Sequence, residues 1–173
     1  RDILLEVTLK KGTYILTAGA KQPHLWFILE GLLREITVGR YSQQTHTSWF
    51  WFNNSFVYAM PGFFDQAPSS VSIEVVKDTK VILLSYSQCR NLRSQFEQAE
   101  LLFESIRSRH GLARKNHLKQ ILSIDTKTRY LSHQKQLNIL FQHVKLKHIA
   151  QYMGMSVDTL GKLHRKHIKT NHL

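Results

Sequence analysis

The residues best suited to binding a charged partner lie near the C-terminal end, between Leu146 and Arg165. This segment reads Leu-Lys-His-Ile-Ala-Gln-Tyr-Met-Gly-Met-Ser-Val-Asp-Thr-Leu-Gly-Lys-Leu-His-Arg, with apolar residues at helical spacing on both sides of Gly154. A glycine at that place allows the positive φ of a tight turn, and Ala150 is small enough for two helices to cross closely. The pattern predicts a helix-turn-helix.

The second helix of this pair carries side chains that could read DNA. Ser156 is a suitable N-cap, and Asp158 in the first turn complements the helix dipole. Small polar residues early in such a helix reach base edges in the major groove, while cationic residues hold phosphates. We assign the base edges to Ser156, Val157, Thr159 and Lys162, and the phosphates to Lys145, Lys147, His148, Arg165 and Lys166.

Two alternatives to this interpretation stay open. A generic amphipathic helix pair with a glycine turn gives a similar pattern. Gly161 lies inside the second helix, where glycine costs roughly 1 kcal/mol relative to alanine. It either permits a close approach to DNA or marks weakened binding.

Positive charge is concentrated in the same half of the chain. The formal net charge is +12, and residues 96–173 contain 14 Lys and Arg against 5 Asp and Glu, whereas residues 1–95 contain 10 against 7. Concentrated positive charge attracts polyanions, of which DNA is the obvious soluble one. A merely solubilising basic surface would have the same composition.

Short β-branched and aromatic runs fill the first half of the chain. They cover residues 3–9, 13–17, 25–29, 32–38, 47–52, 71–76 and 80–85, and turn signals such as Glu30-Gly31 and Lys77-Asp78 separate them. Many short strands with frequent turns predict an antiparallel roll, barrel or sandwich. Because the run Trp49–Phe52 does not alternate in polarity, we expect it to be covered on both faces.

Helical periodicity follows this region. Between residues 96 and 123 apolar residues recur at spacings near three and four or their sum, at Ala99, Leu102, Phe103, Ile106, Ala113, Leu118 and Ile121. A helix of this length, roughly 39 Å, outspans a small domain, so its apolar stripe needs a partner. The partner is either its own β domain or a second copy in a coiled-coil-like dimer, and we favour the dimer.

Shorter helices are expected after the long one, over residues 128–136 and 137–141. We therefore predict an α+β chain in three parts: a sensor β-roll over residues 1–95, a dimerisation helix over residues 96–123 and a helix-turn-helix DNA-binding domain over residues 124–173.

Few residues suit catalysis or metal binding. Cys89 is the only cysteine, which excludes an internal disulfide, a cysteine-rich zinc site and a self-contained iron–sulfur cluster. His164 and His167 share a helix face but lack a neighbouring carboxylate cluster, and no phosphate loop, nucleophile elbow or zinc helix motif is present. We expect no enzyme, metal or cofactor. A cupin-like metal enzyme is the rival class, with His24 and His46 as its only first-half histidines.

No apolar run is long enough to span a membrane, so we expect a cytoplasmic protein without a membrane partner.

Four segments resemble a known family: Leu9–Leu16, Leu25–Arg34, Pro68–Glu74 and Val144–Ala150. With the order of parts, they resemble the Crp–Fnr regulators, the catabolite-activator-like group, especially the divergent branch common in Bacteroidetes. The resemblance covers nearly the whole chain. It implies a cyclic-nucleotide-binding β-roll similar to a cupin jelly roll, a dimerising central helix and a winged helix-turn-helix. The implied function is transcription regulation by a DNA-binding homodimer, with RNA polymerase and a small-molecule effector as further candidate partners.

The sequence departs from that family at the ligand site. Cyclic-nucleotide binders of the family carry a Gly-Glu pair, whose Glu binds the ribose hydroxyl, and an Arg after a Pro that pairs with the cyclic phosphate. Matching on Pro68 puts Ser69 at the Arg position, and Ala59 and Met60 at the Gly-Glu positions. Without a guanidinium the phosphate loses its charge-assisted partner. We therefore expect that cyclic AMP does not bind in the usual way.

The β-roll could still hold another effector. We expect Met60, Phe63, Phe64, Ser69 and Ser70 to line its pocket, because hydroxyls beside aromatic rings suit a small neutral or weakly polar molecule. A closed apolar core without a ligand is an equally weighted alternative. The runner-up function is an effector-sensing or protein-interaction module of the same fold with weakened DNA binding.

Overall fold

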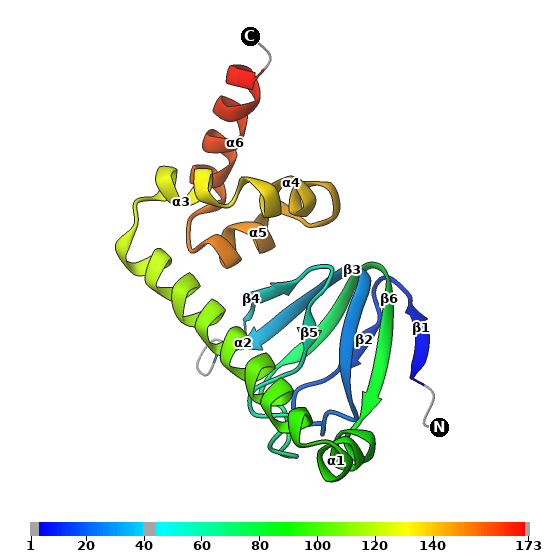
Figure 1. Ribbon diagram of the computed structural model, residues 1–173. Coiled ribbons are helices and arrows are strands. Elements are labelled where there is room, and N and C mark those ends of the chain that lie inside the picture. Colours follow the sequence, from blue (N-terminus) through cyan, green and yellow to red (C-terminus); the bar gives the residue numbers. More distant parts are fainter. Residues whose placement is uncertain (1–3, 40–43, 172–173) are drawn as a thin grey trace. The chain divides into compact units, whose positions relative to one another are not determined.

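The computed structural model describes residues 4–39 and 44–171 and is drawn in Figure 1. The chain forms two compact units, residues 1–109 and 110–173. The strands are β1 (Leu5–Leu9), β2 (Tyr14–Leu16), β3 (His24–Val38), β4 (Thr45–Trp51), β5 (Phe56–Val57) and β6 (Ser72–Ser85). The helices are α1 (Tyr86–Gln95), α2 (Glu97–Ser123), α3 (Thr126–Ser132), α4 (Gln134–His143), α5 (Leu146–Met153) and α6 (Val157–Asn171). The expected α+β class is confirmed.

The sheet of the first unit is antiparallel, as predicted. Its order is β1-β6-β3-β4, with β2 paired to β6 and β5 paired to β3. The ranges 25–29 and 32–38 were expected as two strands, but they form one strand, β3, and 71–76 and 80–85 likewise form β6.

The predicted turn at Glu30-Gly31 was wrong because this glycine makes a bulge instead. The pairing of β3 with β6 shifts register on both sides of Glu30. Gly31 has φ 149°, and a Cβ there would lie 2.2 Å from Oγ1 of Thr79. The glycine therefore lets two long strands bend past each other without a break in the chain.

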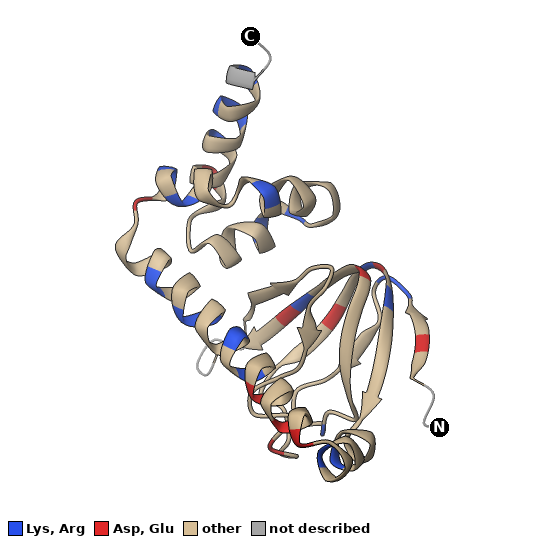
Figure 2. Cartoon of the chain, in the orientation of Figure 1, with Lys and Arg blue, Asp and Glu red and all other residues tan. Residues whose placement is uncertain are grey.

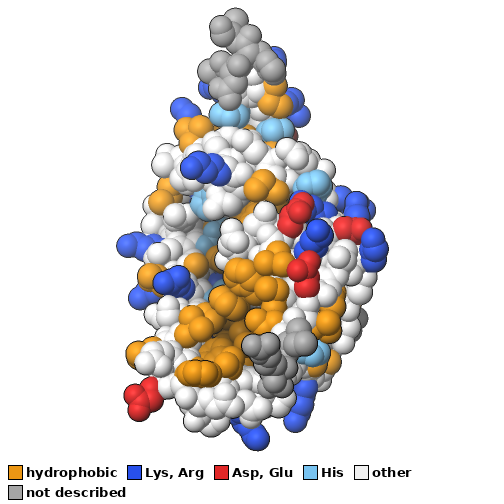
Figure 3. Space-filling model, turned by 45° about the vertical axis from the view of Figure 1, so that its right-hand side comes forward, with side chains coloured by type: hydrophobic (Ala, Val, Ile, Leu, Met, Phe, Trp, Pro, Cys, Tyr) orange, Lys and Arg blue, Asp and Glu red, His pale blue; other side chains and the backbone are white. Residues whose placement is uncertain are grey.

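Inside the roll, Trp26, Leu33 and Trp51 belong to one buried apolar cluster. Phe50 and Trp51 are each 2% exposed although successive strand residues point to opposite faces, so this part of β4 is covered on both sides, as expected. Apolar side chains also gather on the visible face of this unit in Figure 3. The exposed apolar residues of the whole unit include Leu4, Leu5 and Tyr14.

Helix α1 was not predicted. Ser85 Oγ accepts from the backbone N–H of Gln88, and the Gln88 side chain accepts from the backbone N–H of Ser85, which is a capping box. Cys89 on this helix is buried, and burial raises the pKa of its thiol to about 11. The thiol is therefore not prone to form the reactive thiolate.

The long helix α2 has two different faces. Ala99, Phe103 and Ile106 are buried in one cluster with Leu25 and Tyr58 of the same unit. The alternative that the helix packs on its own β domain therefore holds for these three residues. The rest of its surface carries exposed leucines, at positions 101, 102, 112, 118 and 122.

The second unit is helical in its described part, which ends at residue 171 and does not include the wing of the expected winged helix-turn-helix. Helix α3 begins two residues before the expected position because Asp125 caps it, accepting from the N–H groups of Lys127 and Thr128 at 3.1 and 3.0 Å. No helix among the described residues is long and apolar enough to cross a membrane.

Candidate nucleic-acid interface

Helices α5 and α6 form the helix pair expected over residues 146–165, joined by a short turn. Gly154 adopts φ 60°, and a Cβ on it would lie 2.7 Å from Cγ2 of Ile121. Both its conformation and its surroundings therefore require glycine. Ala150 is buried, as are the apolar side chains of Ile149 and Met153 in α5 and Leu160 in α6.

Backbone groups close the end of α5. The N–H of Gly154 donates to the carbonyl of Gln151, and the N–H of Met155 donates to the carbonyl of Ala150, both at 3.1 Å. These two bonds are the Schellman motif, in which a left-handed residue ends the helix. The carbonyls of Tyr152 and Met153 remain for other donors.

Two side chains from neighbouring helices take those carbonyls. Nε2 of His117 in α2 lies 2.9 Å from the carbonyl oxygen of Tyr152, and Nε of Arg129 in α3 lies 2.9 Å from that of Met153. Because a carbonyl only accepts, Nε2 must carry the proton in this contact. The His117 ring also stacks on Tyr152, with centroids 4.3 Å apart.

The exposed side of α6 starts with a hydroxyl pair. Ser156 Oγ accepts from the backbone N–H of Thr159 at 3.0 Å, so the predicted N-cap is confirmed. The same hydroxyl donates to Oγ1 of Thr159 at 2.8 Å. Val157 beside them is exposed, and Thr159 is half-buried.

An ion pair follows one turn later. Nζ of Lys162 lies 2.8 Å from Oδ2 of Asp158, and both side chains are about 70% exposed. The Lys162 ammonium holds the pKa of Asp158 below its usual value. Asp158 was not among the predicted contact residues, although its spacing of four from Lys162 signals the pair.

The other predicted cations lie on the surface of the same unit. Lys145, Lys147, Arg165 and Lys166 are exposed, and Figure 2 shows Lys and Arg distributed over α3 to α6. From residue 110 to residue 173 the sequence has only two acidic residues, Asp125 and Asp158. Positive charge therefore dominates this unit.

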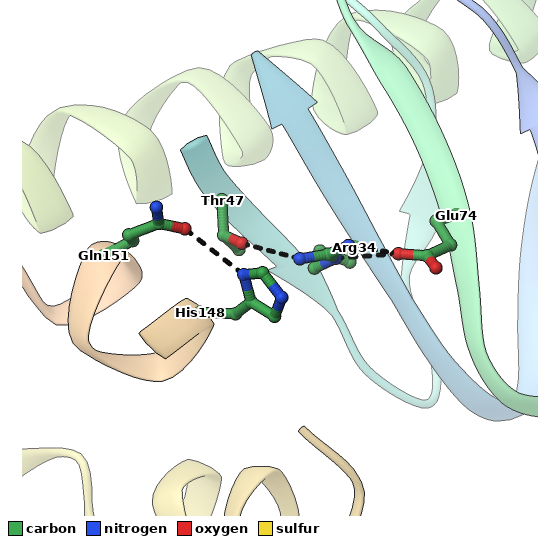
Figure 4. A network of polar contacts seen from close by, with 5 residues as sticks. All are labelled: Arg34, Thr47, Glu74, His148 and Gln151. Carbon is green, nitrogen blue, oxygen red and sulfur yellow. Dashed lines mark hydrogen bonds and ion pairs between the residues drawn. The ribbon is translucent and has the colours of Figure 1, made fainter. Parts of the chain in front are cut away.

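His148 is half-buried, and its Nδ1 lies 3.4 Å from Oε1 of Gln151 (Figure 4). The imidazole is thus partly occupied within its own helix.

His164, considered above as a weak metal candidate, points into the unit. Its ring stacks on Phe141 with centroids 3.7 Å apart, and its Nδ1 lies 3.1 Å from the hydroxyl of Tyr130. It therefore joins α6 to α4 and α3. No group of three His, Cys, Asp or Glu that could hold a metal occurs within the described ranges.

The residues predicted to line an effector pocket occupy different environments. Phe63 is buried and meets Phe64 edge to face at 5.4 Å, within the cluster that includes Phe103. Ser69 is buried, and its hydroxyl donates to the carbonyl of Val71 at 2.8 Å. Met60 and Ser70 are exposed.

A polar contact in the sheet was not predicted. Nε of Arg34 donates to Oε2 of Glu74 at 2.9 Å, and Nη1 donates to the hydroxyl of Thr47 at 3.1 Å (Figure 4). Glu74 thus balances the charge of this arginine.

Comparison with known families finds a match for the first unit. Residues 6–96 match the family model described as the cyclic nucleotide-binding domain. Among curated proteins, none matches the sequence.

Solved structures resemble nearly the whole chain at low identity. FixK2 from Bradyrhizobium japonicum is 12% identical with a TM-score of 0.80, over 98% of this chain and 86% of that chain. The c-di-GMP responsive global regulator CLP of Xanthomonas campestris is 15% identical with a TM-score of 0.67, over 98% and 88%. A Eubacterium rectale protein assigned to the Crp/Fnr family of transcriptional regulators is 16% identical with a TM-score of 0.71, over 95% and 78%. The likeness to Crp/Fnr regulators is confirmed as one of fold, and the Bacteroidetes branch stays a prediction.

Acid should destabilise the C-terminal unit. Burial lowers the pKa of His117 and His164, and lowers that of His110 to about 4. These rings stay neutral in the fold but titrate near 6.5 when unfolded, so their contribution is complete above pH 6.5 and falls as the pH drops toward 4. We expect the melting temperature, followed by circular dichroism, to decrease over this window.

The variant His117→Gln keeps an amide donor for the Tyr152 carbonyl but does not titrate. It should therefore lose less stability between pH 7 and pH 5 than the wild type does, whereas His143→Gln, at an exposed site, should behave as wild type. Equal pH dependence in all three proteins would refute this role of His117.

Proposed function

We propose that this chain, which belongs to the family of proteins with a cyclic nucleotide-binding domain, is a transcription regulator that binds double-stranded DNA through its C-terminal unit. The observation that carries the proposal is the exposed cationic surface of α5 and α6 in a unit with two acidic residues. A polyanion gains most from such a surface by releasing its counterions. We propose no enzyme activity for the chain, and its cytoplasmic location stays a prediction.

In this proposal α6 enters the major groove by its N-terminal turns. Ser156, Val157 and Thr159 reach base edges, together with the paired side chains of Asp158 and Lys162. An aspartate accepts from the N4 amino group of cytosine, and a lysine donates to guanine, so the ion pair suits a G·C base pair. The phosphate contacts come from Lys145, Lys147, His148, Arg165 and Lys166.

Gly161 is not required by packing. A Cβ there would lie 3.6 Å from the Arg165 guanidinium and 3.8 Å from Leu146, which are ordinary contact distances. The proposal therefore assigns no structural role to Gly161. Weakened DNA binding remains the alternative that this glycine suggests.

The variants Thr159→Ala and Lys166→Ala should separate base reading from phosphate binding. Removing Lys166 should weaken binding to every duplex and reduce the slope of log affinity against log salt by about 0.9. Removing the Thr159 hydroxyl should change sequence preference and leave the slope unaltered. Fluorescence anisotropy measures both, with a duplex selected from a random pool and a random duplex.

Lys80→Ala, on an exposed lysine of β6, serves as the control and should bind as wild type does. Equal effects of the two test variants on selected and random DNA would contradict the assignment of roles.

We further propose that the chain acts as a homodimer through α2. One line of this helix passes through Leu101, Ser105, Ser108, Leu112, Lys115, Lys119 and Leu122, in alternating steps of four and three. This is the spacing of the a and d positions of a coiled coil. Its three leucines are 73, 58 and 76% exposed, and the small serines permit close approach of a second helix.

This line differs from the apolar stripe predicted above, which includes the buried Phe103 and Ile106. Lys115 and Lys119 occupy its C-terminal part, where like charges of two parallel copies would repel. The tightest contact of the proposed dimer is therefore between Leu101 and Leu112.

Leu112→Lys and Leu118→Lys form a matched pair that tests this interface. The two leucines are 58 and 56% exposed on the same helix, but only Leu112 lies on the proposed seam. We expect Leu112→Lys to weaken dimerisation about tenfold or more, because it places an unpaired charge in the contact. Leu118→Lys should leave dimerisation unchanged. Sedimentation velocity distinguishes the species, and equal behaviour of the two variants would reject the seam.

The proposal includes a small-molecule effector, and this effector is not cyclic AMP. Ser69, at the position that the family resemblance gives to the phosphate-binding arginine, turns its hydroxyl to the backbone of Val71. Arg34 is balanced by Glu74. Neither therefore supplies a free charged partner for a buried phosphate.

Calorimetric titration with cyclic AMP should accordingly give no binding heat. The same solution should show no shift of melting temperature when the nucleotide is added. A dissociation constant in the micromolar range would contradict this expectation.

A further inference from the structure

Among the described lysines and arginines of the C-terminal unit, Arg129 is the buried one, with 3% of its surface exposed. Its guanidinium donates to five backbone carbonyls. The acceptors are Met153 at 2.9 Å, Gly154 at 3.2 Å, Gln120 at 3.1 Å, Ile121 at 3.1 Å and Ile124 at 2.6 Å. Within the described residues, Arg129 forms no ion pair with a carboxylate.

The acceptors belong to the ends of two different helices. Gln120, Ile121 and Ile124 lie at the C-terminal end of α2, whereas Met153 and Gly154 lie at that of α5. A helix C-terminus has carbonyls without intrahelical partners and carries partial negative charge. Two such ends together offset the cost of burying a guanidinium that lacks a carboxylate.

The fork of the guanidinium makes this contact directional. Nε and Nη2 point to α5, and Nη1 points to α2. Because the group is planar and rigid, these bonds relate the direction of one helix end to that of the other. A lysine ammonium on a flexible stem could retain the charge but could not impose this relation.

We propose that Arg129 is a positioning residue, which sets the angle between the end of α2 and the α5–α6 pair and thereby the distance between the two α6 helices of a dimer on DNA. This inference rests on the proposed function, since it requires a DNA-bound dimer. Half-sites must lie at the separation that matches the two reading helices. Arg129 then determines which spacing between half-sites is bound tightly.

Arg129→Lys tests the proposal, with Arg90→Lys at an exposed site of α1 as the matched control. The probe is a duplex selected by the wild type from a random pool, together with copies whose spacer is one or two base pairs longer or shorter and a copy with a single half-site. We expect the wild type and Arg90→Lys to lose about tenfold or more affinity when the spacer changes. Arg129→Lys should lose the spacing preference but bind the single half-site as the wild type does.

A second variant inserts one glycine between Ile124 and Asp125, which separates Arg129 from the carbonyls of α2 but not from those of α5. It should relax the spacing preference in the same way. Wild-type spacing dependence in either variant would overturn the proposal. Loss of single half-site binding in both variants would also overturn the proposal, because Arg129 would then be needed only for folding. Failure of the wild type to select any sequence would instead refute the proposed function.

Discussion

The carbonyl groups at the end of α5, which have no partner within the regular helix, constrain the whole C-terminal unit. A helix that ends inside a protein must satisfy its last carbonyls or lose the free energy of several hydrogen bonds. Here the turn at Gly154 satisfies two of them through its own backbone, and His117 and Arg129 satisfy the next two. The end of α5 is therefore held by α2 and α3 together, and the direction in which α6 leaves the turn follows from it.

The same constraint explains why several polar residues of this unit are buried. His117 and Arg129 are 9 and 3% exposed, and such burial is unusual for an arginine. Each donates to a carbonyl at the end of α5, which compensates for the burial of its polar group. The positive charge on the surface comes from other residues, chiefly lysines. These exposed residues are the ones that a polyanion can contact.

Features with a local signal could be predicted from the sequence. Gly154 between two apolar helical patterns and Ser156 before α6 are such signals, and the structure has both the turn and the cap. Helix α1 had an equally local signal, a serine at position 85 followed by a glutamine three residues later, which could have been recognised. The Asp158 and Lys162 pair could likewise have been found from its spacing.

Features that depend on packing could not be predicted. Nothing in the sequence pattern distinguishes Arg129 from the exposed arginines, because its role arises only when two helix ends meet around it. The bulge at Gly31 has the same origin, since only the position of Thr79 on the neighbouring strand shows that this glycine is not a turn. For α2, periodicity revealed a helix but could not separate the face that packs on its own unit from the exposed one.

Lysine acetylation of the full chain, with and without duplex DNA and quantified by mass spectrometry, tests the central claim most directly. If α5 and α6 bind the duplex, Lys145, Lys147 and Lys166 react more slowly in its presence, while Lys10 and Lys80 of the sheet unit react at the same rate as in the free chain. Protection confined to Lys10 and Lys80, or no protection at a DNA concentration that binds the chain, would contradict the claim.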